Sequence, residues 1–232
     1  MMLQLKDKRK KLFFYLILFF FLSTQINKHQ TVEGSFNTKI KEIEVFGLSK
    51  NKNLQVVNSL NSLFLQNILF IKKKNFLEIL NKNNLIESFK IKKIYPSKIR
   101  VEIKKTSFLA ITNKNNNKYY IGSNGKLISF EDSEKINKNL PFVFSKSNYE
   151  DFVKLKKNID KSDFKFSDIN SFYYFPSNRW DFKTKNGLLI KLPEKNVLES
   201  LQIAYKIKSN EQFKNKKVID LRINNQIITY ND

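Results

Sequence analysis

The longest apolar run in the sequence extends from Leu12 to Leu22, directly after a basic cluster. The cluster consists of four lysines and one arginine, Lys6, Lys8, Arg9, Lys10 and Lys11. A hydrocarbon core about 30 Å thick needs roughly 20 apolar residues, whereas the apolar part of a secretory signal needs only about 7 to 15. The run therefore fits either a short transmembrane helix, residues 12–26, or a cleavable signal.

The residues after this run favour a helix that is kept. Ser23 to Asn27 contain no pair of small residues with the A-x-A spacing of a cleavage site. Residues 1–11 carry five positive charges and one negative charge, so the positive-inside rule places them in the cytoplasm. We expect a cytoplasmic tail (1–11), a single-pass helix (12–26), a polar linker (27–37) and export of the remainder. A cleaved signal and a buried helix are the alternatives.

The pattern that follows the linker predicts a β-α-α-β-β unit over residues 38–106. A strand-like segment ends at Gly47, and two helical faces come next. Two strands are then expected around Pro96, at 89–95 and 98–104, and the second alternates strictly between apolar and charged residues. The apolar positions that define these elements are Ile40, Ile43, Val45, Phe46, Leu54, Val57, Leu60, Leu63, Phe64, Phe76, Leu77, Ile79, Leu80, Ile99, Val101 and Ile103.

Residues 107–232 predict a mostly antiparallel β domain with flanking helices, which makes the fold class α+β. Asn-Gly pairs at 124–125 and 186–187 indicate two hairpins. Helices are expected at 149–158 and at 194–209, the second directly after Pro193. The chain closes with strands at 217–223 and 226–230, joined by a turn at 224–225.

The net charge of +22 raises the question of nucleic-acid binding. Only four of the 43 basic residues are arginine, and the lysines are spread evenly along the chain. Because base and phosphate recognition relies heavily on arginine, we expect no specific nucleic-acid binding. Attraction to anionic lipid headgroups fits a chain tethered beside a membrane better.

The sequence lacks the residues of the common catalytic and metal sites. It has no cysteine and one histidine, His29 in the linker, which excludes thiol chemistry, a Ser-His-Asp triad and a histidine zinc cluster. Ser-x-x-Lys occurs three times, about the number expected by chance, and five glycines leave little room for a phosphate loop. Asp181, Glu194 and Asp220 have no spacing that marks an acid/base pair. We therefore expect no enzyme activity, cofactor, metal or small-molecule substrate.

An ordered set of motifs extends across most of the chain. It begins with Tyr95-Pro96-Ser97-Lys98-Ile99-Arg100-Val101-Glu102-Ile103 and continues with Arg179-Trp180-Asp181-Phe182, Asn186-Gly187, Leu192-Pro193-Glu194 and Ile219-Asp220-Leu221-Arg222. Together with the basic tail and the single apolar helix, this order resembles the FtsQ/DivIB family of bacterial division proteins. The segment from Lys104 to Ala110 departs from the family pattern.

The resemblance implies a POTRA domain at 38–106 and a family-specific β domain at 107–232, both in the periplasm or its equivalent. It also implies a non-enzymatic scaffold of the division complex, anchored in the cell inner membrane at the septum and bound to the small partners FtsB and FtsL. A POTRA-bearing envelope protein that handles outer-membrane or secreted polypeptides is the alternative function. An exported enzyme acting on envelope polymers is disfavoured by the missing catalytic residues.

The C-terminal strand is the predicted partner site. If residues 226–230 form the last strand of the sheet, its outer edge offers backbone groups to which a partner segment adds a strand. The candidate partner-binding residues are Arg222, Gln226, Ile227, Ile228, Thr229 and Tyr230; the alternative is that they only complete the core. The remaining motif residues are interpreted as mainly structural: Arg179, Trp180, Asp181, Asn186, Gly187, Pro193, Asp220 and Leu221.

Overall fold

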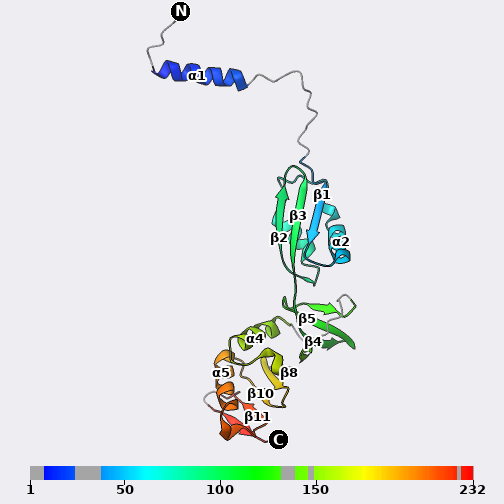
Figure 1. The fold of residues 1–232 in the computed structure, drawn as a ribbon, viewed down its shortest axis with the longest axis vertical. Coiled ribbons are helices and arrows are strands. Elements are labelled where there is room, and N and C mark those ends of the chain that lie inside the picture. The colour runs from blue at the N-terminus through cyan, green and yellow to red at the C-terminus, as the bar shows by residue number, and fades with distance from the viewer. Residues whose placement is uncertain (1–7, 24–37, 132–138, 146–148, 224–225, 232) are drawn as a thin grey trace, which may run out of the picture. The chain divides into compact units, whose positions relative to one another are not determined.

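The computed structural model describes residues 8–23, 38–131, 139–145, 149–223 and 226–231 (Figure 1). The chain divides into two compact units, Met1–Thr38 and Lys39–Asp232. The first contains helix α1, Lys8–Ser23, in which the side chains of residues 12–22 are exposed. In the described part of the chain, no helix has both the length and the apolar character needed to cross a membrane. The predicted span 12–26 begins in α1, and its residues 24–26 lie outside the described residues.

The second unit begins with a three-stranded module that has the expected β-α-α-β-β order. Strand β3 is central, parallel to β1 and antiparallel to β2. Its elements are β1 (Glu42–Phe46), α2 (Lys50–Ser59), the 3-10 turn η1 (Asn61–Leu63), α3 (Lys73–Leu80), β2 (Ile86–Ile94) and β3 (Lys98–Lys105). The strict alternation in β3 buries Ile99, Val101 and Ile103, as predicted.

The buried face of α2 differs from the predicted one. Leu54 is 55% exposed, whereas Val56 is buried. Val56, Leu60 and Leu63 are spaced by four and three residues, so they form the stripe that packs into the core. Leu54 lies two residues before Val56 and therefore points to the opposite side of the helix. Phe46, the last apolar position of the predicted strand segment, is 49% exposed at the end of β1.

The remainder of the second unit is a nine-stranded module with the strand order β12-β11-β10-β9-β8-β7-β4-β5-β6. Neighbouring strands are antiparallel except for the parallel pairs β10–β11, β7–β8 and β4–β7. Its elements are β4 (Phe108–Lys114), β5 (Asn117–Gly122), β6 (Leu127–Ser129), β7 (Phe142–Phe144), α4 (Glu150–Asp160), η2 (Phe166–Asp168), β8 (Ile169–Phe175), β9 (Arg179–Thr184), β10 (Leu189–Lys191), α5 (Val197–Lys208), η3 (Glu211–Phe213), β11 (Val218–Asp220) and β12 (Ile228–Tyr230).

Both Asn-Gly hairpins are present, as β5–β6 and β9–β10. Helix α5 begins at Val197 and not at Glu194, because Asn196 has a left-handed backbone with φ 57°, which a right-handed helix does not continue through. The predicted turn at 224–225 lies outside the described residues. Strands β4, β7 and β8 were not predicted individually.

Helices α4 and α5 contact each other and pack on the nine-stranded sheet (Figure 1). Phe152 of α4 meets Phe172 and Trp180 of the sheet, with ring centroids 5.1 and 5.9 Å apart. The residues of this core, and those of the core beneath β1–β3, all come from 39–232. Residues 39–232 therefore contain the cores of both modules, and we expect this fragment to fold by itself.

The two modules are joined by hydrogen bonds. The Glu87 carboxylate accepts hydrogen bonds from the Ser123 hydroxyl and the Lys104 ammonium. The amide of Asn124 donates to the backbone oxygens of Asn84 and Ile86, at 2.9 and 3.0 Å. The β5–β6 hairpin is thereby fixed to the start of β2.

Candidate functional site: the C-terminal edge of the sheet

Strand β12 is the outermost strand of the nine-stranded sheet, paired on one side with β11. Ile227, just before it, is 53% exposed, and Ile228 and Tyr230 are 42% and 38% exposed. Gln226 is also exposed, and Thr229 is half-buried. The side of β12 away from β11 has no further strand in the described part of the chain. An edge of this kind presents backbone donors and acceptors to a partner.

The strand register places charged side chains in one row that leads to β12. Asp181 of β9 is opposite Lys191 of β10, Lys191 is opposite Asp220 of β11, and Asp220 is opposite Ile228. Residues directly opposite one another project to the same face of a sheet. This face is the one away from Phe182 and Ile190, which belong to the core under α4 and α5. The edge strand therefore continues a row of alternating charge, in which the two aspartates are buried.

Arg222 is held beside β12 by a bidentate ion pair with Asp220. Its Nε lies 2.8 and 2.9 Å from the two carboxylate oxygens, and its terminal nitrogen lies 2.5 Å from Oδ2. Burial opposes ionisation of Asp220, but the hydrogen bonds from Arg222 outweigh it and lower the pKa of this carboxyl. The fixed guanidinium remains partly exposed, with its side chain 36% accessible.

Asp181 lies in the same row with an unsatisfied oxygen. The residue is 4% exposed, and its Oδ1 has no hydrogen-bond partner among the described residues; the same is true of Nε of Arg179. Burial raises the pKa of Asp181 to about 6, although the nearby positive charge of Arg179 opposes that rise. The Arg179 guanidinium also stacks over Phe175, 4.7 Å from the ring centroid.

Lys191 connects the row to the edge strand. Its Nζ donates a 2.7 Å hydrogen bond to the hydroxyl of Tyr230 and lies 5.5 Å from the centre of that ring. This contact orients Tyr230 along the sheet face. Lys191 was not among the predicted site residues. Lys191 could have been predicted from the Asn-Gly turn, because this turn fixes the register of the hairpin in which Lys191 lies, two residues beyond Leu189.

The other motif residues have structural positions. Trp180 is 6% exposed in the core and contacts Tyr174, with ring centroids 4.9 Å apart. Asn186 and Gly187 form the β9–β10 turn, where Gly187 has φ +92° and Asn186 accepts a hydrogen bond from Thr184. Leu221 is buried in the core, and Pro193 lies between β10 and α5.

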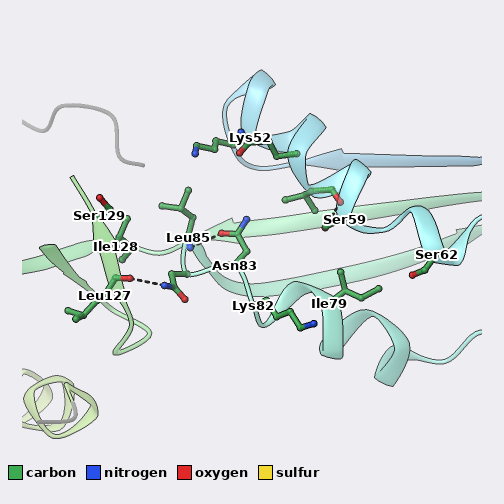
Figure 2. A pocket seen from close by; sticks show the side chains of 13 residues that line it. Lys52, Ser59, Ser62, Ile79, Lys82, Asn83, Leu85, Leu127, Ile128 and Ser129 are labelled. Carbon is green, nitrogen blue, oxygen red and sulfur yellow. Dashed lines mark hydrogen bonds between the residues drawn. The ribbon is translucent and has the colours of Figure 1, made fainter. Parts of the chain in front are cut away.

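A pocket lies between the two modules (Figure 2). This pocket has a volume of about 650 Å³ and is lined by α2, α3 and β6, and Asn84 donates a 2.8 Å hydrogen bond across it to the Leu127 carbonyl. Its lining contains lysines, serines, amides and aliphatic side chains but no carboxylate or histidine. The described residues also contain no cluster of three or more metal-ligating side chains. The edge strand is therefore the better candidate site.

Among the comparisons with known proteins, the match to a family model agrees with the motif pattern. The family model of the cell division protein FtsQ/DivIB, C-terminal, matches residues 110–222. No curated protein matches the sequence significantly. Among solved structures, the major extracytoplasmic domain of the trans isomer of the bacterial cell division protein DivIB from Geobacillus stearothermophilus aligns with 46% of this chain and 93% of that one. That alignment has a TM-score of 0.34 and 11% identity. Residues 110–222 therefore match the C-terminal domain of the FtsQ/DivIB family of cell division proteins.

Proposed function

We propose that this protein is a membrane-anchored, non-enzymatic scaffold of the bacterial division complex and that a partner binds it by adding a β-strand to β12. The exposed outer edge of β12 is the observation that carries the proposal. A partner strand would gain backbone hydrogen bonds, which give affinity with little dependence on sequence. Ile227, Ile228 and Tyr230 would then select the partner through their exposed side chains.

Charge supplies a second element of selection. Arg222 is fixed by Asp220 next to the edge, and Lys191 lies beneath Tyr230. A partner segment with a carboxylate at the matching position would gain a charge-assisted hydrogen bond from an already ordered guanidinium. The partners proposed from the family resemblance are FtsB and FtsL.

The membrane anchor and the POTRA domain belong to the same proposal. The basic residues of 1–11 and the apolar run from Leu12 to Leu22 support a single-pass anchor with a cytoplasmic N-terminus. The β-α-α-β-β order supports a POTRA domain at 38–106, and the β domain at 107–232 would lie with it in the periplasm. A tether would confine β12 near membrane-bound partners at the septum and raise their effective concentration.

A proline scan of β12 tests strand addition. Successive backbone N–H groups of a strand alternate in direction, so Ile228→Pro and Thr229→Pro remove one donor towards β11 and one donor towards the partner. We expect the outward-facing proline to abolish co-purification of FtsB and FtsL while the urea midpoint stays close to that of the wild type. Ile228→Val, which keeps the N–H and an apolar side chain, is the control and should retain most binding. Full co-purification with both prolines in folded protein would refute the proposal.

The cellular role has its own test. Depletion of the protein should give filamentous cells that fail to divide. Loss of outer-membrane proteins without filamentation would favour a role in handling envelope polypeptides and would contradict the scaffold.

A further inference from the structure

One end of the three-stranded module exposes an apolar tip. The most exposed members are Phe70 at 77% and Leu65 at 72%, followed by Tyr95 at 59%, Leu69 at 52% and Ile94 at 37%. They come from two segments, the loop between η1 and α3 and the β2–β3 turn. Grouped exposed apolar residues of this kind often mark a binding surface.

Hydrogen bonds bring the two segments together at the start of β1. The backbone N–H of Ile40 donates to Gln66 at 2.8 Å, and that of Leu65 donates back to Ile40 at 3.0 Å. Lys41 donates to Ser97 of the β2–β3 turn at 2.8 Å. The β2–β3 turn therefore lies at the end of the module where β1 begins (Figure 1).

The loop holds its apolar side chains outward on a fixed backbone. Ile68 and Ile71 are buried in the core, and Leu69 and Phe70 between them project outward. The Asn67 side chain accepts a 2.9 Å hydrogen bond from the N–H of Leu69, which fixes the turn. Leu65 has φ +65°, a left-handed conformation that leucine rarely adopts. This strained loop presents apolar side chains to solvent, which stability alone does not favour.

Lysines surround this tip. The segments 39–42, 65–74 and 93–98 contain seven lysines, one glutamate and no arginine, and therefore have a net charge of +6. The lysines are Lys39, Lys41, Lys72, Lys73, Lys74, Lys93 and Lys98. The glutamate, Glu42, is paired with Lys98 at 3.2 Å, and Glu44 of β1 lies 2.6 Å from the same lysine. Glu78 of α3 lies 4.0 Å from Lys74. Lys93 donates a hydrogen bond to the Leu69 carbonyl at 3.3 Å, so charge and apolar surface are in direct contact.

We propose that this lysine-ringed apolar tip binds the surface of an anionic phospholipid bilayer. Its leucine and phenylalanine side chains enter the headgroup layer, and its lysines bind phosphate groups. The composition favours a bilayer over a protein partner, because the cores of protein interfaces are enriched in arginine and depleted in lysine. The site is distinct from the β12 edge and needs no division partner.

The length of the linker is consistent with binding of the tip to the membrane that would hold α1. Fifteen residues separate Ser23 from Lys39, and such a segment spans at most about 50 Å. With α1 in the bilayer, the tip would therefore stay within reach of the same membrane. Only this argument from linker length rests on the proposed anchor. The proposal that the tip binds lipid does not depend on it.

Vesicle binding by residues 38–232 tests the proposal, because this fragment lacks α1. We expect it to co-sediment with vesicles of phosphatidylglycerol and phosphatidylethanolamine but not with phosphatidylcholine vesicles, and to be released by about 0.5 M salt. One lysine near an anionic surface strengthens binding about five-fold, so replacing Lys72, Lys73 and Lys74 by glutamine should weaken it roughly 100-fold. The matched control replaces the exposed lysines 161, 165 and 214. Equal weakening by both triple variants, or no binding to either vesicle type, would overturn the proposal.

A probe at the tip tests apolar insertion separately. The chain has no cysteine, so Phe70→Cys and Leu54→Cys each give one site for an environment-sensitive fluorophore. Leu54 is a suitable control because it is 55% exposed on α2 of the same module. We expect a blue shift on anionic vesicles for Phe70→Cys only. No shift at position 70, or the same shift at position 54, would contradict insertion of the tip. The urea midpoint of each variant, read from far-UV circular dichroism, which reports on both modules, establishes that it is folded.

Discussion

Replacement of Asp181 by asparagine should change how stability depends on pH. The carboxyl is 4% exposed, and burial raises its pKa from 3.8 to about 6. The folded protein therefore holds this proton more tightly than the unfolded chain does. This favourable contribution is complete below about pH 4 and is lost as the pH rises to about 6.

The size of the effect follows from the two pKa values. A difference between 3.8 and about 6 corresponds to about 3 kcal/mol in the free energy of unfolding. The stability of Asp181→Asn relative to the wild type should therefore be about 3 kcal/mol more favourable at pH 7.5 than at pH 4. Comparing the two pH values cancels any packing effect of the amide that does not depend on pH. In melting temperature, the difference should be roughly 6 to 12 °C.

Urea unfolding followed by tryptophan fluorescence measures this directly. Trp180 is the only tryptophan in the chain, lies next to Asp181 and is buried in the same module. Asp163→Asn, at an exposed position, is the control and should have little effect at either pH. The reasoning is refuted if Asp181→Asn has the same effect on stability at pH 4 and pH 7.5, or destabilises the protein more at the higher pH.

Three further substitutions test separate parts of the structure by urea unfolding. Gly47→Ala should destabilise the three-stranded module by about 3 kcal/mol or more, because φ is +113° and the new Cβ would lie 1.8 Å from a backbone oxygen. The control is Gly187→Ala, whose Cβ would lie in open space and which should cost about 1 kcal/mol. Arg222→Ala should cost roughly 3 kcal/mol because it leaves a buried carboxylate unpaired, and a variant as stable as the wild type would contradict that role. Ser123→Ala should cost about 1 kcal/mol of stability. It should also raise the pKa of Glu87, because the carboxylate loses its strongest hydrogen bond, and an unchanged Glu87 titration by NMR would contradict this.

Local patterns in the sequence predicted much of the fold. The alternation in β3 indicated its buried face, because side chains of a strand alternate between two environments. Both Asn-Gly turns were found, since glycine reaches a positive φ without strain. The β4–β5 hairpin was missed because its turn uses Asn115 and Asn116, with φ 50° and 61°. Asparagine also tolerates the left-handed region, but it signals a turn less strongly than glycine does.

Features that depend on distant residues were not predictable from local patterns. Strand β7 has three residues and pairs in parallel with β4 and β8, so nothing in its own segment defines its neighbours. The edge position of residues 226–230 was expected, and β12 is the outermost strand. The charged row beside it was not expected, because it depends on the register of four strands. Lys191 enters the site only through that register.

Hydrogen exchange at the backbone amides of β12 tests strand addition most directly. The full chain would be compared alone and in complex with FtsB, the partner proposed from the family resemblance. We predict that the amide of β12 that points away from β11 becomes strongly protected in the complex, while the amides of β6 at the opposite edge of the sheet do not change. A bound complex in which every β12 amide exchanges as in the free protein would contradict partner binding by strand addition.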